Sequence, residues 1–185
     1  DSAGPVWVAQ QERLDAQIGP LGALARERAA IRGGEHVLDV GCGCGATTLE
    51  LAESVGAAGR VVAVDISRPM LERARQRVES ARTGARIDWR RDDAQTAAFE
   101  ASGFDLVFSR FGVMFFEDPV AAFTNLRRAL RRGGRLAFVC WQSREKNPWM
   151  LAPAIAAAQH VAFPPPPPPH APGPFAFGDA TRVRE

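Results

Sequence analysis

The chain has 185 residues, of which 46% are apolar and 24% are charged, a composition that excludes disordered and fibrous classes. This length predicts one domain that buries a sizeable core without disulfide or metal support. The charge balance, 23 basic against 21 acidic residues, gives a net charge of +2 and indicates neither a nucleic acid nor an anionic membrane as partner.

Three features of the composition bear on location and chemistry. No apolar run reaches the ~18 residues of a membrane helix, so we expect no membrane insertion. The odd number of cysteines, three, fits a reducing compartment, and nothing at the start resembles a secretion signal, so we expect a cytoplasmic protein. Tyrosine is absent, which excludes a phenol as catalytic group.

The pattern of the chain predicts three segments: helical residues at 1–34, an α/β core at 35–145, and a partial segment, helical and rich in proline, at 146–185. Apolar residues of the first segment recur at helical spacing, and Gly19-Pro20 is expected to interrupt the helix. In the last segment we expect a helix from Asn147 to about Val161 and the start of another helix at 175–185.

The core alternates strands with helices. The expected elements in chain order are a strand at 36–40, a helix at 47–55, a strand at 60–65, a helix at 67–81, strands at 86–89 and 104–109, a helix from 118, and a strand at 135–141. Several strands are continuously apolar, which is typical of strands buried on both faces. The core is therefore predicted to be a doubly wound, Rossmann-like α/β fold with a mostly parallel sheet.

The helix after the fourth strand has the clearest boundaries. Asp118 is expected to cap it, with Pro119 at its first position, and Gly133-Gly134 to end it. Its expected apolar stripe consists of Val120, Phe123, Leu126 and Leu130. Four arginines crowd its predicted end (Arg127, Arg128, Arg131 and Arg132), and we favour a solvated helix face over a nucleic-acid patch.

A glycine loop follows the first strand. The spacing Gly41-x-Gly43-x-x-Ala46, with Asp65 at the end of the second strand, fits the fingerprint of dinucleotide-binding loops. Glycines here let the backbone approach a ligand closely, and the following helix offers unpaired N–H donors. The fingerprint is shared by several nucleoside-binding folds and does not separate them.

Asp39 separates two classes of ligand. It lies two residues before Gly41, where a carboxylate would repel a pyrophosphate but would suit a ligand with positive charge, such as a sulfonium and an amino group. The alternative role is structural, in which Asp39 accepts hydrogen bonds from the loop. The two roles do not exclude one another.

These motifs resemble class I S-adenosylmethionine-dependent methyltransferases, and most nearly the ubiquinone/menaquinone-biosynthesis type. The resemblance covers about residues 35 to 141, in order and spacing. Its motifs are Val37 to Gly45, Val62 to Ser67 with Pro69 to Leu71, Asp93-Ala94, Phe104 to Ser109, and Leu130 to Leu136.

The resemblance implies S-adenosylmethionine as cofactor, with S-adenosylhomocysteine as product. Asp65 would accept from both ribose hydroxyls, Ile66 would cover an adenine face unless it packs in the core, and Asp93-Ala94 would bind the adenine edge, with Asp92 as competitor for the Asp93 role. The implied cofactor-binding residues are Trp7, Asp39, Gly41, Cys42, Gly43, Gly45, Asp65, Ile66, Met70, Asp93, Ala94 and Ser109. Residues 1–34, with Trp7, would form a lid.

The reaction implied by the resemblance is an in-line displacement, which needs positioning more than a nucleophile. Ser109 and Arg110, at the end of the fourth strand, are the positioning candidates, and no catalytic base is identified. Cys42 and Cys44 lack a second Cys or His pair, so we expect no metal site. The three histidines are expected to be structural or solvated.

The acceptor is expected to be a small hydrophobic molecule, methylated on carbon or oxygen. The residues after the fourth strand lack the motif of nucleic-acid amino-methylating enzymes, and five of the six residues from Phe111 to Phe116 are apolar, although core packing explains some of them. The alternatives are an NAD(P)-dependent oxidoreductase, which Asp39 and Asp93-Ala94 disfavour, and a binding or scaffold protein that uses the proline run 164–169. We favour a stiff connector over a partner-binding role for that run.

The family's sheet has the order 3-2-1-4-5-7-6, and this sequence accounts for five strands. A bare fifth strand would be an apolar edge prone to aggregation. We therefore expect either a truncated chain that lacks strands 6 and 7, or an edge covered by another chain, as in a homo-oligomer.

Overall fold

The computed structural model describes residues 3–81, 84–163, 165 and 167–184, and the side chain of residue 80 is excluded. Two compact units are present. The sheet unit comprises Asp1–Val113 and Asp118–Val139, and the C-terminal unit comprises Met114–Glu117 and Cys140–Glu185. All predicted site residues belong to the sheet unit.

The sheet unit contains one parallel sheet of five strands in the order β3-β2-β1-β4-β5. The strands are β1 (His36–Val40), β2 (Arg60–Asp65), β3 (Arg86–Arg91), β4 (Phe104–Arg110) and β5 (Leu130–Val139). Among the strands, the buried apolar residues all lie in the central β1, β2 and β4, because both faces of these strands are covered. The predicted fold class and strand order are confirmed. Within the described part of the chain there is no sixth or seventh strand.

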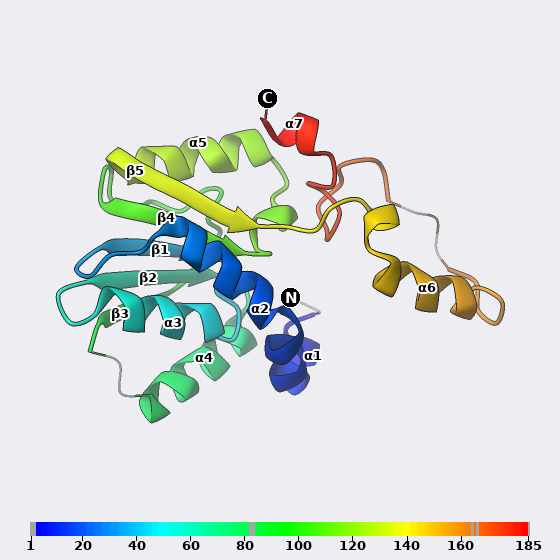
Figure 1. Cartoon of the computed structure of the whole chain (residues 1–185), viewed down its shortest axis with the longest axis horizontal. Helices are drawn as coiled ribbons and strands as arrows, with labels where there is room; N and C mark the ends of the chain where they lie inside the picture. Colours follow the sequence, from blue (N-terminus) through cyan, green and yellow to red (C-terminus); the bar gives the residue numbers. More distant parts are fainter. Residues whose placement is uncertain (1–2, 82–83, 164, 166, 185) are drawn as a thin grey trace. The chain divides into compact units, whose positions relative to one another are not determined.

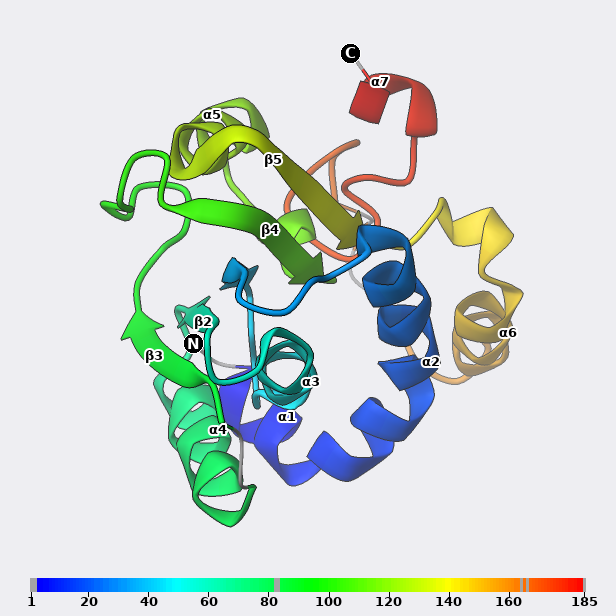
Figure 2. The ribbon, with the colours of Figure 1, turned by 60° about the vertical axis from the view of Figure 1, so that its left-hand side comes forward.

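Helices cover both faces of this sheet (Figures 1 and 2). The helices of the sheet unit are α1 (Gly4–Ala9), α2 (Gln11–Ala29), α3 (Ala46–Val55), α4 (Arg68–Ser80) and α5 (Pro119–Ala129). Figure 2 shows α2, α3 and α4 on one face and α5 on the other. The chain alternates between strand and helix as in a doubly wound sheet, except that no helix lies among the described residues between β3 and β4. The short α1 packs against α4.

The break in the N-terminal helical region differs from the prediction. It lies at Gln10, between α1 and α2, whereas Gly19-Pro20 lies inside α2. A proline removes one backbone hydrogen bond and bends a helix, and Figure 2 shows α2 as a bent helix. The helix continues because Ile18 and Gly22, on either side of the proline, are both buried against the unit.

The boundary between α5 and β5 also differs. Asp118 caps α5 as predicted, since its Oδ1 accepts from the Ala121 N–H at 3.0 Å. The helix ends at Ala129, not at Gly133-Gly134, because Leu130 is extended and pairs with Phe104 at the start of β5. The register shifts between the pair Phe104–Leu130 and the pair Leu106–Arg135, and the two glycines lie in this irregular stretch of β5.

Three smaller differences from the prediction concern α5 and β5. Val120 is 77% exposed and does not belong to the apolar stripe, whereas Leu126 is 1% exposed. Arg131 and Arg132 lie in β5 rather than at a helix end, and Arg131 pairs with Asp105. Strand β5 ends at Val139, two residues before Trp141.

The C-terminal unit contains the short helices η2 (Arg144–Lys146), α6 (Pro148–Ala157) and α7 (Ala180–Arg184), and η1 (Val113–Phe115) joins the units along the chain. Helix α6 is shorter than predicted and has no buried residue. Trp141 and Trp149 pack edge to face at 5.4 Å. Two residues of the proline run, 164 and 166, lie outside the described residues, so the predicted rod is not described. No described helix is long and apolar enough to cross a membrane.

Candidate cofactor site

The glycine loop joins β1 to α3 in a conformation that only glycine adopts without strain. Gly41, Gly43 and Gly45 have φ angles of 69°, 55° and 80°. The Gly41 and Cys42 amides both donate to the Val64 carbonyl, at 2.9 and 3.1 Å, and so bind the loop to the end of β2. The loop therefore lies at the carboxyl edge of the sheet, where folds of this class bind ligands.

Asp65 ends β2 beside this loop, and its carboxylate holds two backbone segments. Its Oδ2 accepts from the Gly43 N–H and its Oδ1 from the Ser67 N–H, both at 2.8 Å. Burial raises the pKa of Asp65, and these amides oppose the rise. The Asp65 side chain thus supports the loop and brings a carboxyl group to the site.

Asp39 lies beneath the loop, at 1% exposure. Its Oδ2 accepts from the Thr48 hydroxyl at 2.6 Å, whereas its Oδ1 has no hydrogen-bond partner within the described structure. Burial raises the pKa of Asp39 to about 6, opposed by the Thr48 hydroxyl and by the charge of Arg110. A buried carboxylate with an unpaired oxygen is costly unless that oxygen gains a donor.

Ser109 and Gly112 bind the end of β4 to the glycine loop. The Ser109 hydroxyl donates to the Val40 carbonyl at 2.8 Å and accepts from the Gly112 N–H at 3.2 Å. A Cβ on Gly41 would lie 2.6 Å from the Cα of Gly112, so the two glycines touch backbone to backbone. Sequence reasoning did not single out Gly112. The available signal was a glycine three residues after Ser109.

The predicted adenine contacts follow β2 and β3. Ile66 is 61% exposed, which contradicts the core-packing alternative for this residue. Asp93 is exposed, and one of its oxygens accepts from the Gln95 N–H at 2.9 Å. The competing Asp92 instead accepts from the Asp93 N–H at 3.1 Å. Ala94 is buried beside Asp93 and its carbonyl accepts from Asn125.

Trp7, Met70 and the two site cysteines complete the predicted cofactor set. Trp7, on α1, is 38% exposed, and the Met70 methyl would lie 3.0 Å from a Cβ on Gly43. Burial raises the pKa of Cys42 well above its usual value and that of Cys44 to about 11, so both thiols are protonated at neutral pH. Neither is an activated nucleophile. No cluster of His, Cys, Asp and Glu able to hold a metal occurs among the residues described.

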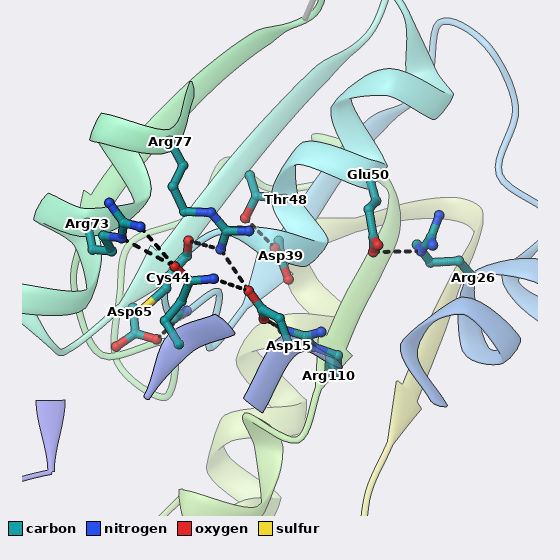
Figure 3. A network of polar contacts seen from close by, with 12 residues as sticks. Asp15, Arg26, Asp39, Cys44, Thr48, Glu50, Asp65, Arg73, Arg77 and Arg110 are labelled. Atoms are coloured by element: carbon teal, nitrogen blue, oxygen red, sulfur yellow. Dashed lines mark hydrogen bonds and ion pairs between the residues drawn. The ribbon is translucent and has the colours of Figure 1, made fainter. Parts of the chain in front are cut away.

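Arg110 is held by the N-terminal helices (Figure 3). Its guanidinium pairs with Asp15 of α2 at 3.2 Å and is 11% exposed. The same carboxylate pairs with Arg77 of α4 at 3.0 Å, and Arg77 donates to the Cys44 carbonyl at 2.8 Å. Sequence reasoning missed Asp15 and Arg77, because neither belongs to a motif.

The apolar run after β4 is mostly buried. Phe111, Val113, Met114 and Phe116 are each at most 8% exposed, and Phe115 is 53% exposed. Phe111 has a positive φ of 62°, unusual for an aromatic residue. Core packing therefore accounts for four of these five side chains.

Comparison with known proteins gives a consistent result. A profile described as a methyltransferase domain matches residues 37–134. An aklanonic acid methyltransferase of Streptomyces sp. strain C5 is 43% identical over 106 residues, which are 57% of this chain and 47% of that protein. A demethylmenaquinone methyltransferase of Lactiplantibacillus plantarum is 36% identical over 118 residues, 64% of this chain and 49% of that protein.

Among solved structures, an N-methyltransferase of Haemonchus contortus in complex with phosphomonomethylethanolamine and S-adenosylhomocysteine is 26% identical, with a TM-score of 0.59. The match covers 71% of this chain and 32% of that protein. The chain spans about half the length of the curated relatives named above.

Proposed function

Because the chain belongs to the class I S-adenosylmethionine-dependent methyltransferases, we propose that it binds S-adenosylmethionine at the glycine loop and methylates a small hydrophobic acceptor. The observation that carries the proposal is Asp39, whose buried oxygen lacks a partner in the described structure at the very place where a cationic ligand would supply a donor. A pyrophosphate would instead be repelled by this carboxylate.

The residues at this edge fit the proposed cofactor. Asp65 would accept from the ribose hydroxyls, since a carboxylate has about four acceptor sites and the loop amides use only some of them. Ile66 would cover the adenine with its exposed side chain, and Asp93 and Ala94 would bind its polar edge. The close approach of Gly41 to Gly112 leaves no room for a side chain between the loop and β4.

Bound S-adenosylmethionine supplies a methyl group that its sulfonium already activates. The chain then needs to orient the reactants and exclude water, and no group of the described site has to act as nucleophile. Ser109 fits a positioning role, because both of its hydrogen bonds tie β1 to the loop after β4. Arg110 fits a similar role, since its charge is paired with Asp15 and lies near Asp39.

The acceptor class is supported by the names of two relatives, which refer to aklanonic acid and demethylmenaquinone. A screen of quinone, phenol and lipid acceptors with labelled cofactor tests this part, and transfer only to charged, polar acceptors would contradict it.

Calorimetric titration with S-adenosylmethionine, S-adenosylhomocysteine and NADH tests the cofactor. We expect both methionine nucleosides to bind and NADH not to bind, and the reverse pattern would support an oxidoreductase. Replacing Asp65 by Ala removes hydrogen bonds to a charged acceptor, which predicts an affinity loss of about 100-fold. The matched control is Asp88→Ala on β3, which removes a carboxylate paired with Arg86. Equal affinity of wild type and Asp65→Ala would refute the ribose role.

A further inference from the structure

Asp15 of α2 lies between two arginines that come from different elements. Its Oδ2 is 3.0 Å from Nη1 of Arg77 on α4, and its Oδ1 is 3.2 Å from Nη2 of Arg110 at the end of β4 (Figure 3). The side chains are 22%, 22% and 11% exposed, respectively. Because these side chains are partly exposed, salt screens their ion pairs less than surface pairs but still weakens them at high concentration.

The contacts of Asp15 extend directly to the glycine loop. Arg77, while paired with Asp15, donates from Nη1 to the Cys44 carbonyl at 2.8 Å. Gln11, one turn before Asp15, donates to Asp15 at 2.6 Å and accepts from Arg73 of α4 at 3.2 Å. One carboxylate thus connects α2 to α4, to the loop and to β4.

The apolar side chains of the N-terminal helices are only partly buried. Ile18 and Ala29 of α2 are buried, whereas Val6 is 63% exposed, Trp7 38%, Leu21 36% and Leu24 48%. Exposed apolar side chains contribute little to holding a helix on its support. The polar contacts around Asp15 therefore act together with the burial of Ile18 in holding the start of α2 in place.

We propose that Asp15 is a positioning residue of the cofactor site, which couples docking of α1 and α2 to the conformation of the glycine loop through Arg77, and to the end of β4 through Arg110. The identity of the bound molecule rests on the proposed function, whereas the coupling itself does not. By linkage, a cofactor that needs the ordered loop favours docked helices, and docked helices raise cofactor affinity by the same factor.

The first test measures hydrogen exchange without cofactor. Asp15→Asn keeps the shape of the side chain and removes its charge, so we expect faster exchange both at residues 4–29 and at the amides of 41–45. The matched control is Glu12→Gln, the same chemical change at an exposed position one turn earlier in α2. Faster exchange in α2 with an unchanged loop would overturn the coupling.

The second test measures affinity for S-adenosylhomocysteine by calorimetry. Loss of a charged hydrogen-bond partner predicts about tenfold weaker binding for Asp15→Asn, partial recovery in Asp15→Glu, and no change in Glu12→Gln. In a double-mutant cycle, Asp15→Asn should weaken binding clearly less when Arg77 is already Met. Additive effects would overturn the route through Arg77.

Failures of the two proposals are distinguishable. If wild type binds neither methionine nucleoside, the proposed cofactor is wrong, and the exchange experiment still tests the coupling. If Asp15→Asn does not fold, wild-type exchange at low and at about 1 M salt replaces it, because salt weakens these ion pairs. Helix and loop amides should then exchange faster together, and protection that is independent of salt would contradict the proposal.

Discussion

Replacing Asp39 by Asn should stabilise the folded chain at neutral pH and weaken cofactor binding. The carboxylate is buried, one oxygen lacks a partner among the described residues, and burial raises its pKa from the usual 3.8 to about 6. Because one pKa unit corresponds to about 1.4 kcal/mol, this difference corresponds to about 3 kcal/mol of penalty for the ionised form in the folded state.

The sign of the pH dependence follows from the raised pKa. Between about pH 4 and 6 the folded state keeps a proton on Asp39 that the unfolded state releases. The contribution of Asp39 to the free energy of unfolding therefore falls as pH rises and is lowest above pH 6. Asn cannot ionise and escapes this penalty. At about pH 7.5 the free energy of unfolding of Asp39→Asn should exceed that of wild type by at most about 3 kcal/mol, because the amide N–H groups of Asn also need partners.

The assay is urea unfolding of wild type and Asp39→Asn at about pH 4.5 and 7.5. We expect the difference in unfolding free energy to shift in favour of Asn as pH rises, and Glu53→Gln, an exposed control on α3, should not reproduce this shift. A difference that is the same at both pH values would refute the reasoning. Cofactor affinity of Asp39→Asn should fall at least about tenfold, since an amide does not attract a cation.

Two further substitutions test the packing around the sheet. Gly112→Ala places a Cβ 2.8 Å from the Cα of Gly41, so calorimetry should show weaker cofactor binding and urea unfolding should show a loss of about 2 kcal/mol. The control Gly33→Ala, where a Cβ meets nothing within 4 Å, should be neutral or stabilising. Glu35→Gln should cost about 2 kcal/mol at pH 7, because Arg135 donates to both of its oxygens at 2.8 Å. Arg135 lowers the pKa of Glu35 below 4.5, so this cost should shrink as pH falls below 4.5, and an effect that persists in acid would contradict it.

Much of the fold could be predicted because its signals are local. The run from β1 through the glycine loop to α3 follows from an apolar strand, three glycines and a helix start, all adjacent in sequence. The cap at Asp118 is likewise local, and it forms the expected hydrogen bond with the Ala121 N–H. Such elements depend little on what packs against them.

Two boundaries could not be predicted because tertiary contacts decide them. A proline usually ends a helix, yet α2 continues past Pro20, because Ile18 and Gly22 on either side of it are buried. A pair of glycines usually marks the end of a helix, yet α5 ends before Gly133-Gly134, because Leu130 already pairs with Phe104. Neither contact can be read from spacing along the chain.

The same division applies to the candidate site. Asp39 and Asp65 were predicted, because Asp39 lies two residues before Gly41 and Asp65 ends the second strand. Their roles toward a ligand stay predictions. Asp15 and Arg77 were missed, since they meet across 62 residues of sequence on helix faces without a motif. The contact of Gly112 with Gly41 was also missed, because the two glycines lie far apart in the sequence and share no motif.

A crystal structure of the chain grown with S-adenosylhomocysteine tests the central claim most directly. The account predicts a nucleoside at the carboxyl edge of the sheet, with its ribose on Asp65 and its amino-acid part beside the loop from Gly41 to Gly45 and nearest to Asp39. A nucleoside bound elsewhere, or a loop that stays empty at saturating S-adenosylhomocysteine while accepting NADH, would contradict it.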